Sequence, residues 1–106
     1  MFARIVSMQL KPNTQKEFTQ TFEKEIIPTL KRQQGFQDEI LFVVPDGTEV
    51  VAISLWDSQQ NAETYNRATY PEVLKTLANL VQPTPKVQTF DVAYSTFHKL
   101  AARVAA

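Results

Sequence analysis

Two apolar runs constrain the fold of this chain more than any other feature. Residues 40–44 read Ile-Leu-Phe-Val-Val, and residues 50–57 read Val-Val-Ala-Ile-Ser-Leu-Trp-Asp. A strand from a sheet with one wet face alternates apolar and polar residues, whereas these runs are apolar on both strand faces. With 106 residues, the chain is too short to supply helices for both sides of the sheet. We therefore expect one sheet face to carry the chain's own helices and the other to pack against a second copy.

The apolar pattern of the second strand illustrates this expectation. Simple alternation places Phe36, Ile40 and Phe42 on one strand face, with Leu41 and Val43 on the other. An apolar face of this extent is larger than a soluble monomer usually leaves exposed. Two such faces packed together would form a sandwich or closed barrel, so the sequence predicts a homodimer.

Length and composition narrow the class of protein. A chain of 106 residues fits one domain, spanning residues 1–106. Its 11 basic and 11 acidic residues balance, without the basic footprint of a nucleic-acid or anionic-membrane binder. No segment approaches the roughly 20 apolar residues of a membrane span, and residues 1–7 do not resemble an export signal. Together with the absence of cysteine, this favours a soluble cytoplasmic protein.

The order of predicted elements indicates an α+β fold. Strands are predicted over residues 2–10, 36–44, 49–57 and 86–98. Helices are predicted between residues 14 and 35, over 58–69 and over 71–81, and residues 100–106 are expected to form a short helix or to fray. With right-handed crossovers, this order gives a ferredoxin-like four-stranded antiparallel sheet with helices on one face. Pairing of two such sheets would give a dimeric α/β barrel.

Short signals mark the ends of these elements. Asn13 or Thr14 is predicted to cap the first helix. Pro28 falls inside the apolar stripe of that helix and predicts a kink or step, because proline lacks a backbone donor. Gly35 is expected to end the helix in the left-handed conformation, and residues 45–48 to form a hairpin turn.

The residue inventory excludes several kinds of site. His98 is the sole histidine and there is no cysteine, so a chain cannot form a histidine cluster or a His–Cys pair. Both glycines, Gly35 and Gly47, are accounted for by turns, which leaves no glycine-rich phosphate loop. We therefore expect no metal site, no nucleotide site and no serine-hydrolase site.

Aromatic residues provide the remaining candidates for a site. Trp56 ends the third strand and Tyr65 lies in the helix that follows. With Val6, Phe22 and Ile26, they could line a cavity between the sheet and the helices. A mostly apolar cavity with a phenol or indole N–H suits a flat aromatic or polyketide-like molecule. The alternative is that all five residues are ordinary core.

Arg4 is an unusual residue for its position. It shares a strand face with Val6 and Met8, which are expected to face the core. We expect Arg4 to lie at the sheet margin and extend its guanidinium into water. Pairing with a substrate anion is the alternative.

Several short motifs, in their order and spacing, resemble the antibiotic biosynthesis monooxygenase (ABM) family. The motifs are Lys11-Pro12, Ile26-Ile27-Pro28, Gln34-Gly35-Phe36, Trp56-Asp57-Ser58 with Tyr65 nine positions after the tryptophan, and Phe90-Asp91-Val92-Ala93-Tyr94. The resemblance implies a homodimeric barrel with one cleft per protomer. It also implies oxygenation of an aromatic substrate without metal or flavin, in which the substrate is its own reductant. Tyr65 and Trp56 match family positions that line the pocket, and Tyr65 is the candidate catalytic residue.

The haem-degrading branch of that family does not fit this chain. That branch uses an asparagine on the first strand, a tryptophan on the second helix and a histidine about ten residues later. Here residues 2–10 contain no asparagine, Tyr65 replaces the tryptophan, and Lys75 replaces the histidine. Two hypotheses remain: a cofactor-independent oxygenase, or a non-catalytic dimeric module such as a ligand carrier, a sensor of small aromatics or a stress-response accessory. The second is motivated by a shortage of titratable groups in the presumed cleft.

Overall fold

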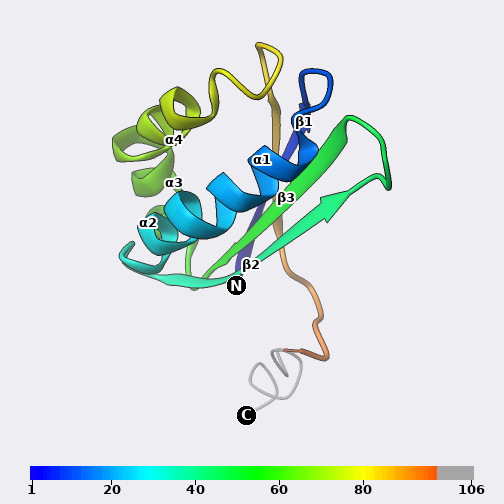
Figure 1. The fold of residues 1–106 in the computed structure, drawn as a ribbon. Coiled ribbons are helices and arrows are strands. Elements are labelled where there is room, and N and C mark those ends of the chain that lie inside the picture. The colour runs from blue at the N-terminus through cyan, green and yellow to red at the C-terminus, as the bar shows by residue number, and fades with distance from the viewer. Residues whose placement is uncertain (98–106) are drawn as a thin grey trace.

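The computed structural model describes residues 1–97 and contains one four-stranded sheet (Figure 1). The strands are β1 (Phe2–Gln9), β2 (Phe36–Val43), β3 (Glu49–Trp56) and β4 (Lys86–Asp91). Their order is β2-β3-β1-β4, and every neighbouring pair is antiparallel. The helices gather on one face of the sheet. This is the ferredoxin-like α+β arrangement predicted from the element order.

The helical layer consists of five segments. They are α1 (Gln15–Thr21), the π-helical η1 (Phe22–Ile26), α2 (Ile27–Lys31), α3 (Gln59–Ala68) and α4 (Tyr70–Leu77). The first three follow one another directly, and the π-helical turn ends at Ile26, two residues before Pro28. A proline cannot donate the ordinary helical hydrogen bond, and its ring crowds the preceding turn, so a wider turn accommodates it. The step predicted at Pro28 is confirmed.

Some predicted element ends are wrong. Thr14 occupies the N-cap position of α1, but its hydroxyl lies 2.7 Å from the Lys11 carbonyl oxygen instead of accepting from the helix. Gly35 adopts the predicted left-handed φ of 82°, but α2 has already ended at Lys31, so the glycine shapes the turn into β2. β4 ends at Asp91, well before residue 98. The expectation for residues 100–106, like the position of His98, falls outside the described residues.

The core lies between the helices and one face of the sheet. Alternate residues of β1 and β3 point into it, because successive strand side chains point to opposite faces. Its most completely buried large side chains are Phe18, Val50, Trp56 and Leu77. Ser58 begins α3 by accepting a hydrogen bond from the Asn61 backbone N–H at 3.2 Å, as expected for a serine N-cap. This cap fixes the start of the helix that carries Tyr65.

A β-bulge changes the alternation of β2. The pairing of β2 with β3 shifts between Phe36 and Asp38. Phe36 therefore packs on the helix side, where its ring meets Trp56 edge-on at 5.6 Å between centroids. The predicted grouping of Phe36 with Ile40 and Phe42 is wrong. The extra residue in the bulge shifts the alternation by one position, so Phe36 faces the helices while Ile40 and Phe42 face the other way.

The opposite face of the sheet is apolar and no described element covers it. Its apolar side chains are Ile5, Ile40, Phe42, Val51, Ile53, Leu55 and Phe90, which the strand pairing places on one surface. Phe42 is 52% exposed and Phe90 is 49% exposed. The two apolar runs thus form strands with apolar side chains on both faces.

Gly35→Ala should lower the free energy of unfolding by about 1–3 kcal/mol. The residue has a left-handed φ, and an added Cβ would clash with the Asp57 carboxylate and the Asn61 side chain. Urea unfolding followed by the fluorescence of Trp56, the sole tryptophan, measures the change. The exposed neighbour supplies the control, since Gln34→Ala should change stability by less than about 0.5 kcal/mol. Equal stability of the two variants would contradict the argument.

Candidate functional site

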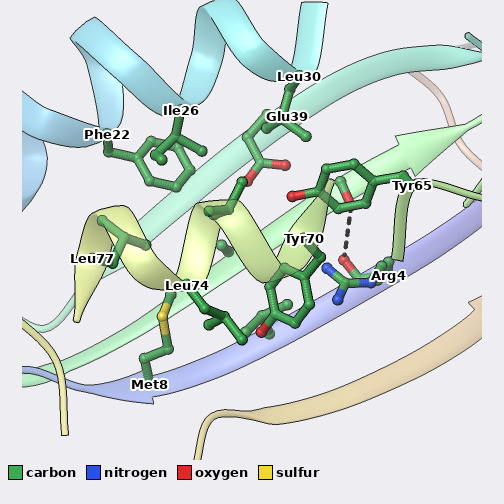
Figure 2. A pocket seen from close by; sticks show the side chains of 14 residues that line it. Arg4, Met8, Phe22, Ile26, Leu30, Glu39, Tyr65, Tyr70, Leu74 and Leu77 are labelled. Atoms are coloured by element: carbon green, nitrogen blue, oxygen red, sulfur yellow. Dashed lines mark hydrogen bonds between the residues drawn. The ribbon is translucent and has the colours of Figure 1, made fainter. Parts of the chain in front are cut away.

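A narrow cavity lies between the sheet and the helices (Figure 2). Its volume is about 30 Å³, which is room for about one or two water molecules. Side chains from β1, β2, β3, η1, α2, α3 and α4 line it. The wall is largely apolar, with the polar side chains Arg4, Glu39, Ser54, Tyr65 and Tyr70.

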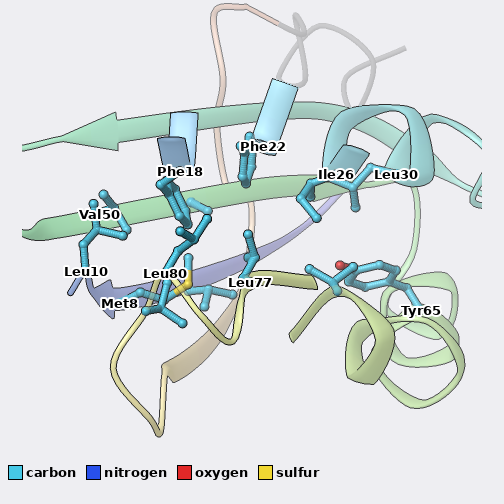
Figure 3. Close-up of a cluster of buried hydrophobic side chains, with 14 of the residues drawn as sticks. Met8, Leu10, Phe18, Phe22, Ile26, Leu30, Val50, Tyr65, Leu77 and Leu80 are labelled. Carbon is cyan, nitrogen blue, oxygen red and sulfur yellow. The ribbon is translucent and has the colours of Figure 1, made fainter. Parts of the chain in front are cut away.

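The predicted site residues are distributed between this wall and the layer behind it. Val6, Phe22, Ile26 and Tyr65 line the cavity. Figure 3 shows Tyr65 at one end of the buried apolar cluster, beside Ile26. Trp56 does not line the cavity. It is fully buried, with its ring centroid 5.0 Å from that of Tyr65.

A chain of contacts links Trp56 to the strands beneath the cavity. Its indole Nε1–H donates to the Ser54 hydroxyl at 2.9 Å, and that hydroxyl donates to the Arg4 carbonyl oxygen at 3.4 Å. The Trp56 ring then supports the ring of Tyr65 from behind. Trp56 therefore fixes the position of a cavity side chain.

Arg4 is buried at the cavity and is not at a sheet margin. Only 3% of the residue is exposed, so the expectation that its guanidinium reaches water is wrong. The guanidinium carbon lies 3.9 Å from the ring centroid of Tyr70 and 5.3 Å from that of Tyr65. Its Nη2 donates to Oδ1 of Asn66 at 2.8 Å. Two aromatic faces and an amide oxygen thus replace water around the cation.

Glu39 is a cavity residue that sequence reasoning missed. It is paired with buried Ser54 in the β2–β3 ladder, and its carboxyl lies in the cavity. The Oε1 atom is buried without a hydrogen-bond partner. Burial raises the pKa of Glu39 to about 8, while the positive charge of Arg4 acts in the opposite direction. The signal in the sequence was that Glu39 lies two positions before Leu41, so that both side chains fall on the helix-facing side of β2.

Arg4 and Glu39 share the cavity without forming an ion pair. Within residues 1–97, the ion pair found within 4 Å joins exposed Lys75 and Glu72 at 3.4 Å. The guanidinium is instead occupied by aromatic rings and by Asn66. The cavity therefore holds a fixed cation and a carboxyl oxygen without a hydrogen-bond partner. A bound ligand can interact with both groups.

The two tyrosines add neutral hydrogen-bond donors. Burial raises the pKa of Tyr65 and of Tyr70, so both phenols stay protonated near neutral pH, although the Arg4 charge opposes the rise. Figure 2 shows the Tyr65 hydroxyl and the Glu39 carboxyl pointing toward one another. The Tyr70 hydroxyl is buried and has no hydrogen-bond partner. Sequence reasoning did not single out Tyr70, which is followed by Pro71 in the first turn of α4.

A second hollow meets the cavity at Arg4. Its volume is about 120 Å³, and it lies between α3 and the strands β1 and β4. Phe2, Ala62, Asn66 and Val87 are among its lining residues, together with Arg4. Arg4 thus lines both hollows.

Residues 1–97 contain no group of three or more His, Cys, Asp or Glu side chains placed to hold a metal ion. None of the helices in that range has the length and apolar character needed to cross a membrane.

One protein-family model matches the chain. The model describes antibiotic biosynthesis monooxygenase and covers residues 1–75. This range includes every residue of the cavity wall except Leu77. The resemblance noted at residues 90–94 lies beyond the matched range. No functionally curated protein matches the sequence.

Solved structures share the fold at low sequence identity. A monooxygenase from the ActVA-Orf6 gene of Streptomyces coelicolor, solved with Nanaomycin D, is 21% identical, with a TM-score of 0.75 over 89% of this chain and 88% of that one. SnoaB, a cofactor-independent oxygenase from Streptomyces nogalater, is 16% identical, with a TM-score of 0.74 over 90% and 95%. NE2512, a protein of unknown function from Nitrosomonas europaea, is 14% identical, with a TM-score of 0.73 over 90% and 91%. At these identities, the likeness establishes the fold.

Glu39→Gln should flatten the pH dependence of stability. Because the folded state raises the pKa of Glu39 from 4.5 to about 8, its proton is held more tightly in the folded chain. The stability this gives is fully present below about pH 4.5 and is lost as pH rises toward 8. Urea unfolding at about pH 5 and about pH 8 should show a smaller loss in the variant, by about 1 kcal/mol or more.

The control for this measurement is Glu49→Gln, at an exposed position at the start of β3. That variant should keep the pH dependence of the unmodified protein. Identical pH dependence in all three proteins would contradict the location of Glu39 in a dry cavity.

Proposed function

The chain belongs to the antibiotic biosynthesis monooxygenase family, and from this premise we propose that it oxygenates a small aromatic substrate of the quinol or anthrone type without metal or flavin. The observation that carries the proposal is the buried guanidinium of Arg4 in a largely apolar cavity. A fixed positive charge in a site that excludes water stabilises an oxyanion far more than the same charge in water. An electron-rich aromatic oxyanion is the form of such a substrate that reacts with O₂.

The reaction needs no external reductant. For an anthrone, the enol tautomer loses its hydroxyl proton to give the enolate, which transfers electrons to O₂ as a carbon–oxygen bond forms. Cleavage of the oxygen–oxygen bond and loss of the second hydrogen then leave a carbonyl on the ring and release water. The methylene carbon is oxidised and O₂ is reduced, so atoms and electrons balance as CH₂ + O₂ → C=O + H₂O.

Each residue of the wall has a role in this proposal. Arg4 faces the substrate oxyanion, and the neutral phenol of Tyr65 donates a hydrogen bond to it. Val6, Phe22 and Ile26 hold the aromatic rings and exclude water. Trp56 keeps the Tyr65 ring in place from the layer behind.

Substrate binding requires the cavity to widen. Small-molecule sites usually enclose about 300 Å³ or more, whereas this cavity has about 30 Å³. α4 supplies Tyr70, Val73, Leu74 and Leu77 to the wall, and it packs chiefly against α3. The joint between these helices is Thr69, whose φ of −120° departs from helical geometry. We infer that α4 moves away from the sheet to admit the substrate, with half-buried Leu74 at the rim.

A second copy of the chain is the proposed partner for the uncovered sheet face. Phe42 and Phe90 are about half exposed there, beside the half-buried Ile5, Val51 and Ile53. Covering such a face with an identical one would bury roughly 2,000 Å², the lower range of obligate dimers. The result would be a dimeric barrel with one cavity per protomer.

The alternative of a non-catalytic ligand-binding module loses its original motivation. It depended on a shortage of titratable groups in the cleft, but the cavity wall contains Arg4, Glu39, Tyr65 and Tyr70. The module hypothesis itself stays a prediction. Native mass spectrometry that finds a retained small molecule, together with no turnover of any quinol or anthrone, would support it.

Under O₂, purified protein should accelerate the oxidation of an anthrone to the quinone with release of water, and of a naphthoquinol to the quinone with release of H₂O₂. Tyr65→Phe removes the hydroxyl that donates to the oxyanion and should lower kcat by about 10-fold or more. Quinone absorbance measures the rate. Tyr94→Phe, at a residue that is 67% exposed, is the matched control and should keep the full rate. Absence of protein-dependent oxidation, or equal rates for Tyr65→Phe and Tyr94→Phe, would count against the proposal.

Analytical ultracentrifugation at micromolar concentration should show a dimer. Phe42→Asp places a charge within the proposed interface and should shift the protein to monomer, because an unpaired buried charge is strongly unfavourable. Gln60→Asp, on the exposed side of α3, should leave the dimer intact. A folded monomer as the sole species of the unmodified protein would exclude the proposed barrel.

A further inference from the structure

We propose that Glu39 is the proton acceptor of this cavity, taking the proton from the substrate hydroxyl while Arg4 faces the oxyanion that forms. This inference rests on the proposed function of the same cavity and adds a catalytic residue to it. Neither the family match nor the fold assigns a role to a carboxyl at this point of β2.

The position of Glu39 is the first observation. Glu39 lies in the regular part of β2, where it pairs with Ser54 of β3, and it lines the cavity. In Figure 2 its carboxyl projects among the apolar side chains of the wall, toward the Tyr65 hydroxyl. A substrate oxygen held by Tyr65 would therefore lie close to the carboxyl.

The missing partner is the second observation. Oε1 of Glu39 is buried with no hydrogen bond. Buried polar atoms are nearly always paired, and exceptions mark functional groups or sites for a ligand. A substrate hydroxyl would supply the missing donor, and its proton would then need only to move along that hydrogen bond.

The electrostatic surroundings suit a base that works near neutral pH. The charged and titratable groups facing Glu39 are Arg4 from β1, Tyr65 from α3 and Tyr70 from α4. On β2 itself, Asp38 precedes it and belongs to the opposite strand face. Burial raises the pKa of Glu39 to about 8. A general base is most effective when its pKa lies near the working pH, and this value approaches the pKa of about 10 of a simple phenol.

The proton transfer leaves the net charge of the cavity unchanged. The substrate O–H bond breaks, its electron pair stays on the oxygen, and a new O–H bond forms on the Glu39 carboxylate. The negative charge thus moves from Glu39 to the substrate oxygen, where it faces the guanidinium of Arg4. Glu39 is then neutral, the form that its buried surroundings favour.

A binding experiment tests the assignment without turnover. The probe is 2-hydroxy-1,4-naphthoquinone, whose hydroxyl is already ionised in neutral buffer, so its complex resembles the state after proton transfer. Quenching of Trp56 fluorescence measures its affinity. Above about pH 8, the affinity of the unmodified protein should fall about 10-fold per pH unit, because Glu39 must take up one proton to accommodate the anion. Glu39→Gln should abolish this dependence, and Glu49→Gln should keep it.

A kinetic experiment tests the same role during turnover. For a naphthoquinol, kcat/KM should rise with pH to a plateau above about 8, and Glu39→Gln should lower it about 100-fold and remove that step. Glu39→Asp retains a carboxylate and should recover part of the rate. A quinol made acidic enough to be ionised in the buffer should lose little with Glu39→Gln, since no proton has to be removed.

The outcomes separate this inference from the proposed function. Probe binding with equal pH dependence in the unmodified protein and Glu39→Gln would overturn the assignment of Glu39 alone. The expected pH-dependent binding with no oxidation of any quinol would uphold Glu39 as the proton acceptor and overturn the oxygenase. No binding of the probe at any pH would overturn both.

Discussion

The burial of the Arg4 guanidinium in the middle of β1 is the interaction on which the candidate site depends. A cation removed from water is tolerated only where other groups replace its hydration. Here the Tyr70 ring at 3.9 Å, the Tyr65 ring and the Asn66 amide take that role. α3 and α4 must therefore meet directly above β1, and the same meeting point encloses the cavity. The arginine thus defines both the packing of the helices and the charge of the site.

The polar groups of the cavity impose a cost on stability. An unpaired carboxyl oxygen on Glu39 and an unpaired phenol on Tyr70 are both buried, and each such atom costs about 1–3 kcal/mol relative to a satisfied one. An apolar residue at position 39 would remove one of these costs without disturbing the strand. That the folded chain retains both groups in one cavity, beside a cation, is typical of sites organised for a ligand at the expense of stability.

The fold could largely be predicted from the sequence, whereas the polar half of the site could not. Apolar periodicity and Pro28 are local signals, and the strands and helices that they predicted are present. The bulge between Phe36 and Asp38 determines that Phe36 and Glu39 face the same side of the sheet, and simple alternation along the sequence does not reveal it. Arg4 was assigned to the margin because its partners, Asn66 and Tyr70, are more than 60 residues away in the chain. Contacts between distant segments create the environment of a charged side chain, and a single sequence does not specify them.

The β-bulge at the start of β2 has a consequence for how this chain can vary. It lets Phe36 and Glu39, three positions apart, both face the protein interior. Loss of one residue from this irregular stretch would restore plain alternation, in which both side chains still face inward. Homologous chains one residue shorter here would therefore keep the acid opposite Ser54 in the cavity. The length of this stretch can thus vary by one residue without changing which side chains enter the site.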